Sequence, residues 1–231
     1  FLFFHTYVVH APYRDRRFTA GLDGGRLAAP VKGKKLPLFY LGLTHGRLQP
    51  TASEREFLLA LYDGGVARAD EMVAELWSAL ERLELTGRTV VIVTSDHGEE
   101  FWQHTGRAAY HGHTLYDELL RVPLVWFDPG LAGGRVIEAP VSLIDIVPTV
   151  AARFGLERPA RLDGLDLTPL LAGAPWQEER ILFAEAVRHG PSRVSVRTPR
   201  GKLIEALVAA ATTPEERARA VILAANYGQA G

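Results

Sequence analysis

Thr89-Val90-Val91-Ile92-Val93-Thr94-Ser95-Asp96-His97-Gly98-Glu99 is the stretch that decides the fold. Its first six residues are all β-branched, which is typical of a strand covered on both faces. Polar residues follow at once, beginning with Ser95 and Asp96. Ligands in open α/β sheets bind beyond the carboxyl ends of the strands. The stretch therefore predicts a strand that delivers functional side chains at its end.

Neighbouring segments indicate a layered α/β fold. A helix is predicted over residues 66–83, with an apolar stripe that should face a core and Gly87 just past its end. An earlier helix is predicted to begin at Ser53, with Glu56 completing a capping box. Residues 122–127 predict a second buried strand. A helix followed by a buried strand favours a largely parallel sheet.

The first fifty residues predict a strand and a long connection. Residues 1–9 are aromatic and β-branched and predict a buried strand already under way, without an initiator Met. We therefore expect that an N-terminal portion precedes this sequence, and that any signal for export or membrane anchoring lies there. Residues 14–50 show no sustained period and are predicted to form a loop or lid. Lys32, Lys34 and Lys35 in that segment could meet an anionic substrate, but they are interpreted as solvated.

The pattern changes after Gly155, and we predict a domain boundary there. Residues 1–155 would form the α/β domain, and residues 156–231 a small antiparallel α+β subdomain. Short strands are predicted over 181–187 and 194–197, with a hairpin turn at Gly201. A final helix is predicted to begin at Thr213, with Pro214 in its first turn.

Composition excludes several classes of function. The 231 residues carry 26 basic and 27 acidic side chains, a net charge of −1, so no global field attracts nucleic acid or an anionic membrane. Cysteine is absent, which excludes disulfides and a cysteine nucleophile within this sequence. No apolar run approaches the roughly 20 residues of a membrane-spanning helix. We therefore predict no nucleic-acid partner and no membrane segment in this chain.

Histidine and aspartate carry the candidate chemistry. Asp96 and His97 offer an oxygen and a nitrogen donor side by side at a strand end, which suits one divalent cation. The alternative is that Asp96 caps a turn and His97 lies on the surface. Four of the eight histidines fall between positions 97 and 113, and His111 and His113 would share a face in an extended segment. His104 is interpreted as incidental.

His10 is the third candidate. It follows the predicted first strand and precedes Pro12, which stiffens the backbone there. A histidine held at that point could donate a hydrogen bond to an anionic oxygen. His5, within the predicted strand, fits a core residue better.

Together these motifs resemble the C-terminal portion of sulfatases, within the alkaline phosphatase superfamily. The likeness lies in four stretches, which occur in the family's order: residues 10–13, 94–99, 111–118 leading into 121–124, and 140–149 followed by 163–171. The resemblance implies a partial alkaline-phosphatase-like layered α/β sheet with the small C-terminal subdomain. It also implies metal-dependent hydrolysis of sulfate esters, with a small-molecule or glycan sulfate or phosphate ester as substrate.

The resemblance assigns roles residue by residue. Asp96 and His97 match metal ligands, His10 matches a histidine that contacts the sulfate or phosphate group, and His111 matches one that helps to protonate the leaving oxygen. His113 falls on a variable position and receives no role. The metal is expected to be Ca²⁺ by family, while the imidazole ligand widens the expectation to Mn²⁺ or Zn²⁺.

The nucleophile of the family is not found in this sequence. A formylglycine made from Cys or Ser in a C/S-x-P-S-R motif, or a Ser or Thr nucleophile, is expected in the missing N-terminal part. The stretch at 189–193, His-Gly-Pro-Ser-Arg, mimics the tail of that motif but is interpreted as a coincidence. We therefore expect the chain alone to be inactive. The sequence is also compatible with a phosphodiesterase or phosphonate hydrolase, a phosphoethanolamine-type transferase and a non-catalytic sulfatase-like module.

Overall fold

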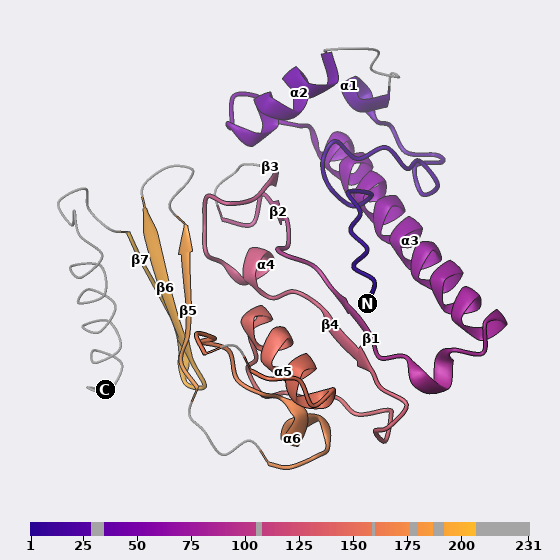
Figure 1. The fold of residues 1–231 in the computed structure, drawn as a ribbon. Helices are drawn as coiled ribbons and strands as arrows, with labels where there is room; N and C mark the ends of the chain where they lie inside the picture. Colours follow the sequence, from indigo (N-terminus) through magenta and orange to yellow (C-terminus); the bar gives the residue numbers. More distant parts are fainter. Residues whose placement is uncertain (29–34, 105–107, 159, 176–179, 187–191, 207–231) are drawn as a thin grey trace. The chain divides into compact units, whose positions relative to one another are not determined.

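The computed structural model describes residues 1–28, 35–104, 108–158, 160–175, 180–186 and 192–206 (Figure 1). The chain divides into two compact units. Unit 1 comprises Phe1–Thr89 with Glu99–Tyr110, and unit 2 comprises Val90–Gly98 with His111–Gly231. The domain boundary at residue 155 stays a prediction. No helix in the described part of the chain is long and apolar enough to cross a membrane.

Unit 1 is built on three helices and a short hairpin. The helices are α1 (Gly25–Ala28), α2 (Lys35–Thr44) and α3 (Ala52–Arg82), and the 3-10 helix η1 (Thr86–Arg88) follows them. The hairpin pairs β2 (Glu100–Phe101) antiparallel with β3 (Ala108–Tyr110). The predicted lid at 14–50 therefore contains α1 and α2. Lys32, Lys34 and the side chain of Lys35 lie outside the described residues.

Helix α3 is one continuous helix where the sequence predicted two (Figure 1). Its cap is Thr51, whose hydroxyl accepts from the N–H of Glu54, and the Glu54 carboxylate accepts from the N–H of Thr51. The predicted cap at Ser53 with Glu56 is wrong. The motif spacing fits both registers, and the Thr51 register also lets Glu54 bond the backbone and side chain of Arg26.

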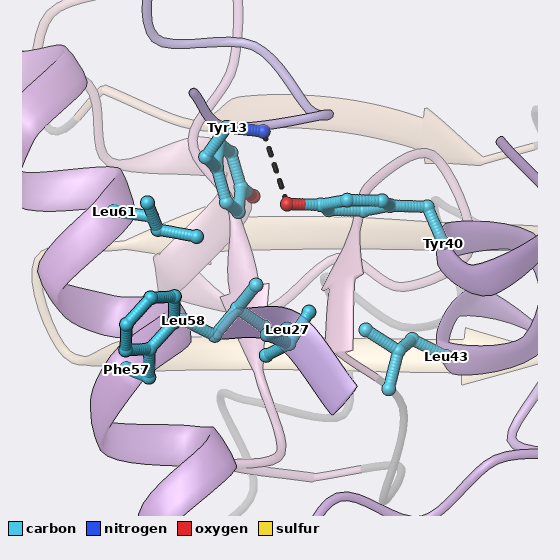
Figure 2. Close-up of a cluster of buried hydrophobic side chains, with 7 residues drawn as sticks. All are labelled: Tyr13, Leu27, Tyr40, Leu43, Phe57, Leu58 and Leu61. Carbon is cyan, nitrogen blue, oxygen red and sulfur yellow. Dashed lines mark hydrogen bonds between the residues drawn. The ribbon is translucent and has the colours of Figure 1, made fainter. Parts of the chain in front are cut away.

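The core of unit 1 lies on the N-terminal half of α3, not on the stripe predicted over 66–83. Val66, Leu76 and Leu83 are exposed. Figure 2 shows the buried cluster, which consists of Tyr13, Leu27, Tyr40, Leu43, Phe57, Leu58 and Leu61. The backbone N–H of Tyr13 donates to the Tyr40 hydroxyl at 3.1 Å, which ties the segment after His10 to α2.

Residues 1–9 do not form the predicted buried strand. They have no regular strand structure, and the side chains of Phe1 to Tyr7 are exposed. A strand needs a hydrogen-bonded partner, and no strand in the described part of the chain pairs with this segment. Gly87 also departs from its expected role, because the positive φ after α3 falls on Glu84, at 54°.

Unit 2 contains the strand that the opening stretch predicted. Strand β1 (Val91–Thr94) is confirmed, and β4 (Leu124–Phe127) lies within the second predicted strand. They pair antiparallel, with Val91 opposite Phe127 and Thr94 opposite Leu124. The expectation of a largely parallel sheet is wrong for the described strands, all of which pair antiparallel. Residues Val91 to Val93 are half-buried, so β1 is less covered than its composition suggested.

Helices and a second sheet complete unit 2. The helices are α4 (Asp117–Leu120), the 3-10 helix η2 (Leu143–Asp145), α5 (Ile146–Arg153) and α6 (Thr168–Leu171). The predicted C-terminal strands are confirmed as an antiparallel sheet of β5 (Leu182–Ala186), β6 (Arg193–Thr198) and β7 (Gly201–Ala206) (Figure 1). The helix predicted from Thr213 lies outside the described residues.

A buried ion pair connects η2 to the chain before β5. Asp145 is fully buried and receives a bidentate contact from Arg180. The N–H groups of Ser142 and Leu165 donate to the same carboxylate at 2.7 and 2.9 Å. Burial alone would raise the pKa of Asp145, but these donors hold it below its usual value.

Candidate active site

The turn after β1 carries Asp96 and His97. The Thr94 hydroxyl donates to the Pro123 carbonyl at 2.7 Å, and the Ser95 hydroxyl donates to the His97 carbonyl at 3.0 Å. The Asp96 carboxylate accepts from the N–H of His97 at 3.1 Å, and most of the Asp96 side chain is exposed. The strand therefore ends in a hydrogen-bonded turn that presents a carboxylate beside an imidazole.

Gly98 fixes this turn against the segment that contains α4. Its N–H donates to the Leu119 carbonyl at 2.9 Å. A Cβ at Gly98 would lie 1.9 Å from the Glu118 carbonyl oxygen, so any other residue would force the two segments apart. Two of the motif stretches, at 94–99 and 111–118, are thus held together by a contact that only glycine allows.

The ring of His97 is oriented by the backbone. Its Nδ1 donates to the Gly98 carbonyl at 2.7 Å, since a carbonyl oxygen can only accept. The ring's lone pair is then on Nε2, and a backbone partner of this kind on the other nitrogen is usual for metal-binding histidines. His97 Nε2 lies 3.8 Å from Asp96 Oδ1.

The dyad of Asp96 and His97 fits a single divalent cation. Two donors that share one cation each lie about 2.0–2.6 Å from it, so they stay within about 5 Å of each other. The 3.8 Å between Asp96 Oδ1 and His97 Nε2 meets this limit. Among the residues that the structure describes, no group of three or more His, Cys, Asp or Glu side chains could hold a metal ion. As a predicted metal site, the dyad would therefore need further ligands.

His111 lies directly on His97. The two imidazole rings stack with their centroids 4.0 Å apart and their planes 27° apart. His111 is half-buried, and Gly112 after it has a φ of 75°. This left-handed residue breaks the extended backbone, so the expectation that His111 and His113 share a face is wrong. The structure brings three of the four predicted site residues together: Asp96, His97 and His111.

His113 and His104 stay outside this group. His113 is buried with 3% of its surface exposed, and its carbonyl accepts from Arg193 at 2.6 Å. Its position is that of a core residue. His104 is exposed, as its interpretation as an incidental residue implied.

His10 belongs to unit 1, whereas Asp96, His97 and His111 belong to unit 2. Its Nδ1 donates to the Ala11 carbonyl at 2.5 Å, so Nε2 is the ring nitrogen that can contact other groups. The Tyr7 ring packs edge-on against it, with centroids 5.6 Å apart. The convergence of His10 with the other three stays a prediction.

The comparison with known sequences identifies the family. The sequence model of the Sulfatase family matches residues 1–156. The chain belongs to the Sulfatase family. This match confirms the resemblance to sulfatases, and it covers the motif stretches from residue 10 to residue 149 but not residues 163–171.

Curated relatives of this sulfatase-family chain include arylsulfatase K. The mouse protein (Mus musculus) is 34% identical over 133 residues, which is 58% of this chain and 24% of the relative. The human protein (Homo sapiens) is 35% identical over 120 residues, 52% of this chain and 22% of the relative. The chain therefore spans about a quarter of the length of the curated relatives it matches.

Solved structures confirm the alkaline-phosphatase-like α/β fold of this sulfatase-family chain. A phosphonate monoester hydrolase from Silicibacter pomeroyi superposes with a TM-score of 0.64 at 25% identity, covering 85% of this chain and 44% of its own. The corresponding enzyme from Agrobacterium radiobacter gives 0.58 at 28% identity, with 68% and 34% covered. A 2-O GAG sulfatase gives 0.63 at 19% identity, with 83% and 48% covered, and supports the fold alone.

One contact of this sulfatase-family chain was not predicted from the sequence. The buried Tyr13 hydroxyl donates to Glu99 Oε2 at 2.8 Å, across 86 positions. Burial, together with the neighbouring Glu99 carboxylate, raises the pKa of Tyr13 well above its usual value. Both residues flank predicted site residues in the sequence, but nothing local to either one signals that they are partners. The stretch at 189–191 that mimics the nucleophile motif lies outside the described residues.

Proposed function

We propose that this chain contributes to the metal-dependent hydrolysis of sulfate esters. The observation that supports this proposal most directly is the stacking of His97 on His111 at 4.0 Å, with Asp96 adjacent. Two motifs that serve different roles in sulfatases thereby meet at one point. Membership of the Sulfatase family supports the same activity.

Asp96 and His97 would hold the divalent ion, through Oδ1 and Nε2. A bound cation would stabilise the negative charge that develops on the nonbridging oxygens of the ester. Ca²⁺ is the expected metal by family, and the imidazole nitrogen gives Mn²⁺ or Zn²⁺ a ligand that they accept more readily. Since the dyad is a partial ligand set, further carboxylates are required.

The two remaining histidines would act on the ester itself. His111 would donate a proton to the leaving oxygen, which otherwise departs as a poorly stabilised alkoxide. His10 would donate from Nε2 to a nonbridging oxygen, since its Nδ1 bonds the Ala11 carbonyl. A formylglycine, or a Ser or Thr nucleophile, would complete the reaction. The substrate would be a small-molecule or glycan sulfate ester.

Hydrolysis of phosphonate monoesters is the second candidate. It is favoured by the likeness to phosphonate monoester hydrolases at 25% and 28% identity. Sulfate and phosphonate monoesters are both tetrahedral anions, so the same cation and imidazole donors suit either. A phosphoethanolamine-type transferase and a non-catalytic sulfatase-like module are also compatible with the fold.

The test uses the protein translated from the complete reading frame that contains this sequence. It is assayed with 4-nitrophenyl sulfate and with the 4-nitrophenyl monoester of phenylphosphonate, and its metal content is measured by mass spectrometry. Asp96→Ala should lower both metal content and kcat, the latter by about 100-fold or more. Asp70→Ala is the matched control, because Asp70 is exposed on α3.

Each outcome separates the candidates. Faster turnover of the sulfate ester supports sulfate ester hydrolysis, and faster turnover of the phosphonate supports the second candidate. A folded protein that binds the metal but cleaves neither ester supports the non-catalytic module. Full activity and metal content in Asp96→Ala would overturn the assigned metal site.

A further inference from the structure

A cavity in unit 1 contains His10 and an arginine that no motif assigned. Its volume is about 650 Å³, and all of its lining residues belong to unit 1: Tyr7, Val8, His10, Ala11, Pro12, Arg14, Asp15 and Arg68. Most of the lining therefore comes from one short segment, residues 7–15, and the rest from α3. His10 and Arg14 therefore line the same cavity.

The segment that forms this cavity lies tightly on α3. A Cβ at Gly64 would lie 2.6 Å from the Asp15 carbonyl oxygen, and a Cβ at Gly65 would lie 2.9 Å from the Val8 carbonyl oxygen. Two adjacent glycines in a helix cost about 1 kcal/mol each relative to alanine. The close backbone contact explains their presence, and it gives the cavity a fixed wall.

Most charges around the cavity are already neutralised. Asp15 accepts from Arg17 at 2.9 Å, and Arg17 also pairs with Glu71 at 2.5 Å. Arg68 pairs with Glu71 and Glu75 at 3.0 and 3.1 Å. The hydrogen bond from the Arg17 side chain is the largest cause of the lowered pKa of Asp15, so this carboxylate stays ionised and paired with Arg17.

Arg14 differs from the other two guanidinium groups. In the part of the chain that the structure describes, no ion pair or hydrogen bond of its guanidinium is seen, and the residue is exposed. A guanidinium is a planar fork that matches the two oxygens of a carboxylate or sulfate group. It is therefore the cation of this cavity that is available to an anionic ligand.

We propose that Arg14 binds a second oxyanion group of the substrate, so that the enzyme prefers esters that carry an additional carboxylate or sulfate. This inference rests on the proposed function, because it places the ester to be cleaved at His10. Arg14 follows His10 by four positions in the same cavity lining. A substrate with two separate anionic groups meets both residues, whereas a simple aryl sulfate meets His10 alone.

Binding of non-hydrolysable sulfonates to this chain tests the subsite without any turnover. Isothermal titration calorimetry compares benzenesulfonate with 4-sulfobenzoate, which adds a carboxylate, and with 1,4-benzenedisulfonate, which adds a sulfonate. The chain should bind one or both dianions about tenfold more tightly than the monoanion. Which dianion gains more tells whether the second group is a carboxylate or a sulfate.

The variants assign this preference to one side chain. Arg14→Ala should remove the preference and leave affinity for benzenesulfonate unchanged, and Arg14→Lys should retain part of it, because an ammonium keeps the charge without the fork. Arg47→Ala removes the same charge from an exposed position in unit 1 outside the cavity lining and should change nothing. The proposal is overturned if the chain binds none of the ligands or binds all three with equal affinity. It is also overturned if Arg14→Ala lowers the affinity for all three equally.

Kinetics on the complete reading frame separates this inference from the proposed function. The substrates are 4-nitrophenyl sulfate and its analogue with a carboxylate on the ring. Arg14→Ala should lower kcat/KM about tenfold for the carboxylated ester and less than about twofold for the simple one. A dianion preference in binding without turnover of either ester would retain the subsite and reject the hydrolase. Turnover of both esters, with a substrate preference that Arg14→Ala leaves unchanged, would retain the hydrolase and reject the subsite.

Discussion

The imidazole of His111 stacks on that of His97, with 4.0 Å between the ring centroids. This contact joins the turn after β1 to the segment that begins 14 positions later. Because Gly98 also bonds the Leu119 carbonyl, the two segments are held at two points. The fold itself thereby places His111, the proposed proton donor, beside His97, the proposed metal ligand.

The first prediction concerns His111 as a proton donor. His111→Ala, in the protein from the complete reading frame, should slow hydrolysis of esters with poor leaving groups more than that of esters with good ones. The reason is that a leaving oxygen of high pKa requires protonation, while a nitrophenolate does not. The measurement is kcat/KM across a series of aryl sulfates that differ in the pKa of the phenol. His104→Ala, at an exposed histidine, is the control, and equal slowing across the series in His111→Ala would argue against the acid role.

The second prediction concerns the glycines of α3. Gly64→Ala should destabilise the protein by about 2 kcal/mol, although helix propensity alone favours alanine by about 1 kcal/mol. The new Cβ would lie 2.6 Å from the Asp15 carbonyl oxygen, so the segment that carries His10 must shift. Gly87→Ala is the matched control, since no atom lies within 4 Å of its Cβ position. Urea denaturation gives both values, and a stabilising Gly64→Ala would contradict the contact.

The features that a local sequence signal determines were predicted correctly. The β-branched run located β1, and the turn after it held Asp96 and His97 as predicted. The direction of the sheet could not be found in this way, because the pairing of β1 with β4 is decided by residues more than twenty positions away. For the same reason residues 1–9 carry strand composition without forming a strand.

The cap of α3 shows the same limit on a smaller scale. Both Thr51 with Glu54 and Ser53 with Glu56 satisfy the spacing of a capping box. The register is decided by Arg26, which lies 28 positions before Glu54 and bonds its carboxylate at 2.7 Å. The capping-box motif is defined by spacing within a few residues, so it cannot take a partner as distant as Arg26 into account.

The third prediction uses this pair to test stability against pH. Hydrogen bonds from the Arg26 side chain are the largest cause of the pKa of Glu54, which is lowered from 4.5 to about 2. A carboxyl whose pKa is lower in the folded state stabilises the protein above its unfolded pKa, and this stabilisation is lost as pH falls toward the folded value. Glu54→Gln should therefore cost about 2 kcal/mol at pH 7, and the difference from wild type should shrink between about pH 4.5 and 2.

The control for Glu54 lies two positions away on the same helix. Glu56 is exposed, and Glu56→Gln should change stability by less than about 0.5 kcal/mol. Chemical denaturation at several pH values between 2 and 7 measures all three proteins. A difference between wild type and Glu54→Gln that is independent of pH would show that the Arg26 contact does not depend on the charge of Glu54.

The fourth prediction compares a buried ion pair with an exposed one. Asp145 is fully buried and is held by Arg180, whereas Asp117 is exposed and contacts Arg197 and Lys202. Asp145→Asn should cost about 3 kcal/mol or more, because it leaves the guanidinium of Arg180 buried without a counter-charge. Asp117→Asn should cost less than about 1 kcal/mol, since solvent and salt screen that pair.

Salt gives these two variants a second readout. Raising ionic strength should reduce the small effect of Asp117→Asn further, while the effect of Asp145→Asn should persist, because buried charges are screened much less. Urea denaturation at low and high salt provides the four values. Equal costs for the two substitutions would mean that the contacts of Asp145 with Arg180, Ser142 and Leu165 add nothing beyond a surface pair, and that this carboxylate does not anchor the chain before β5 to η2.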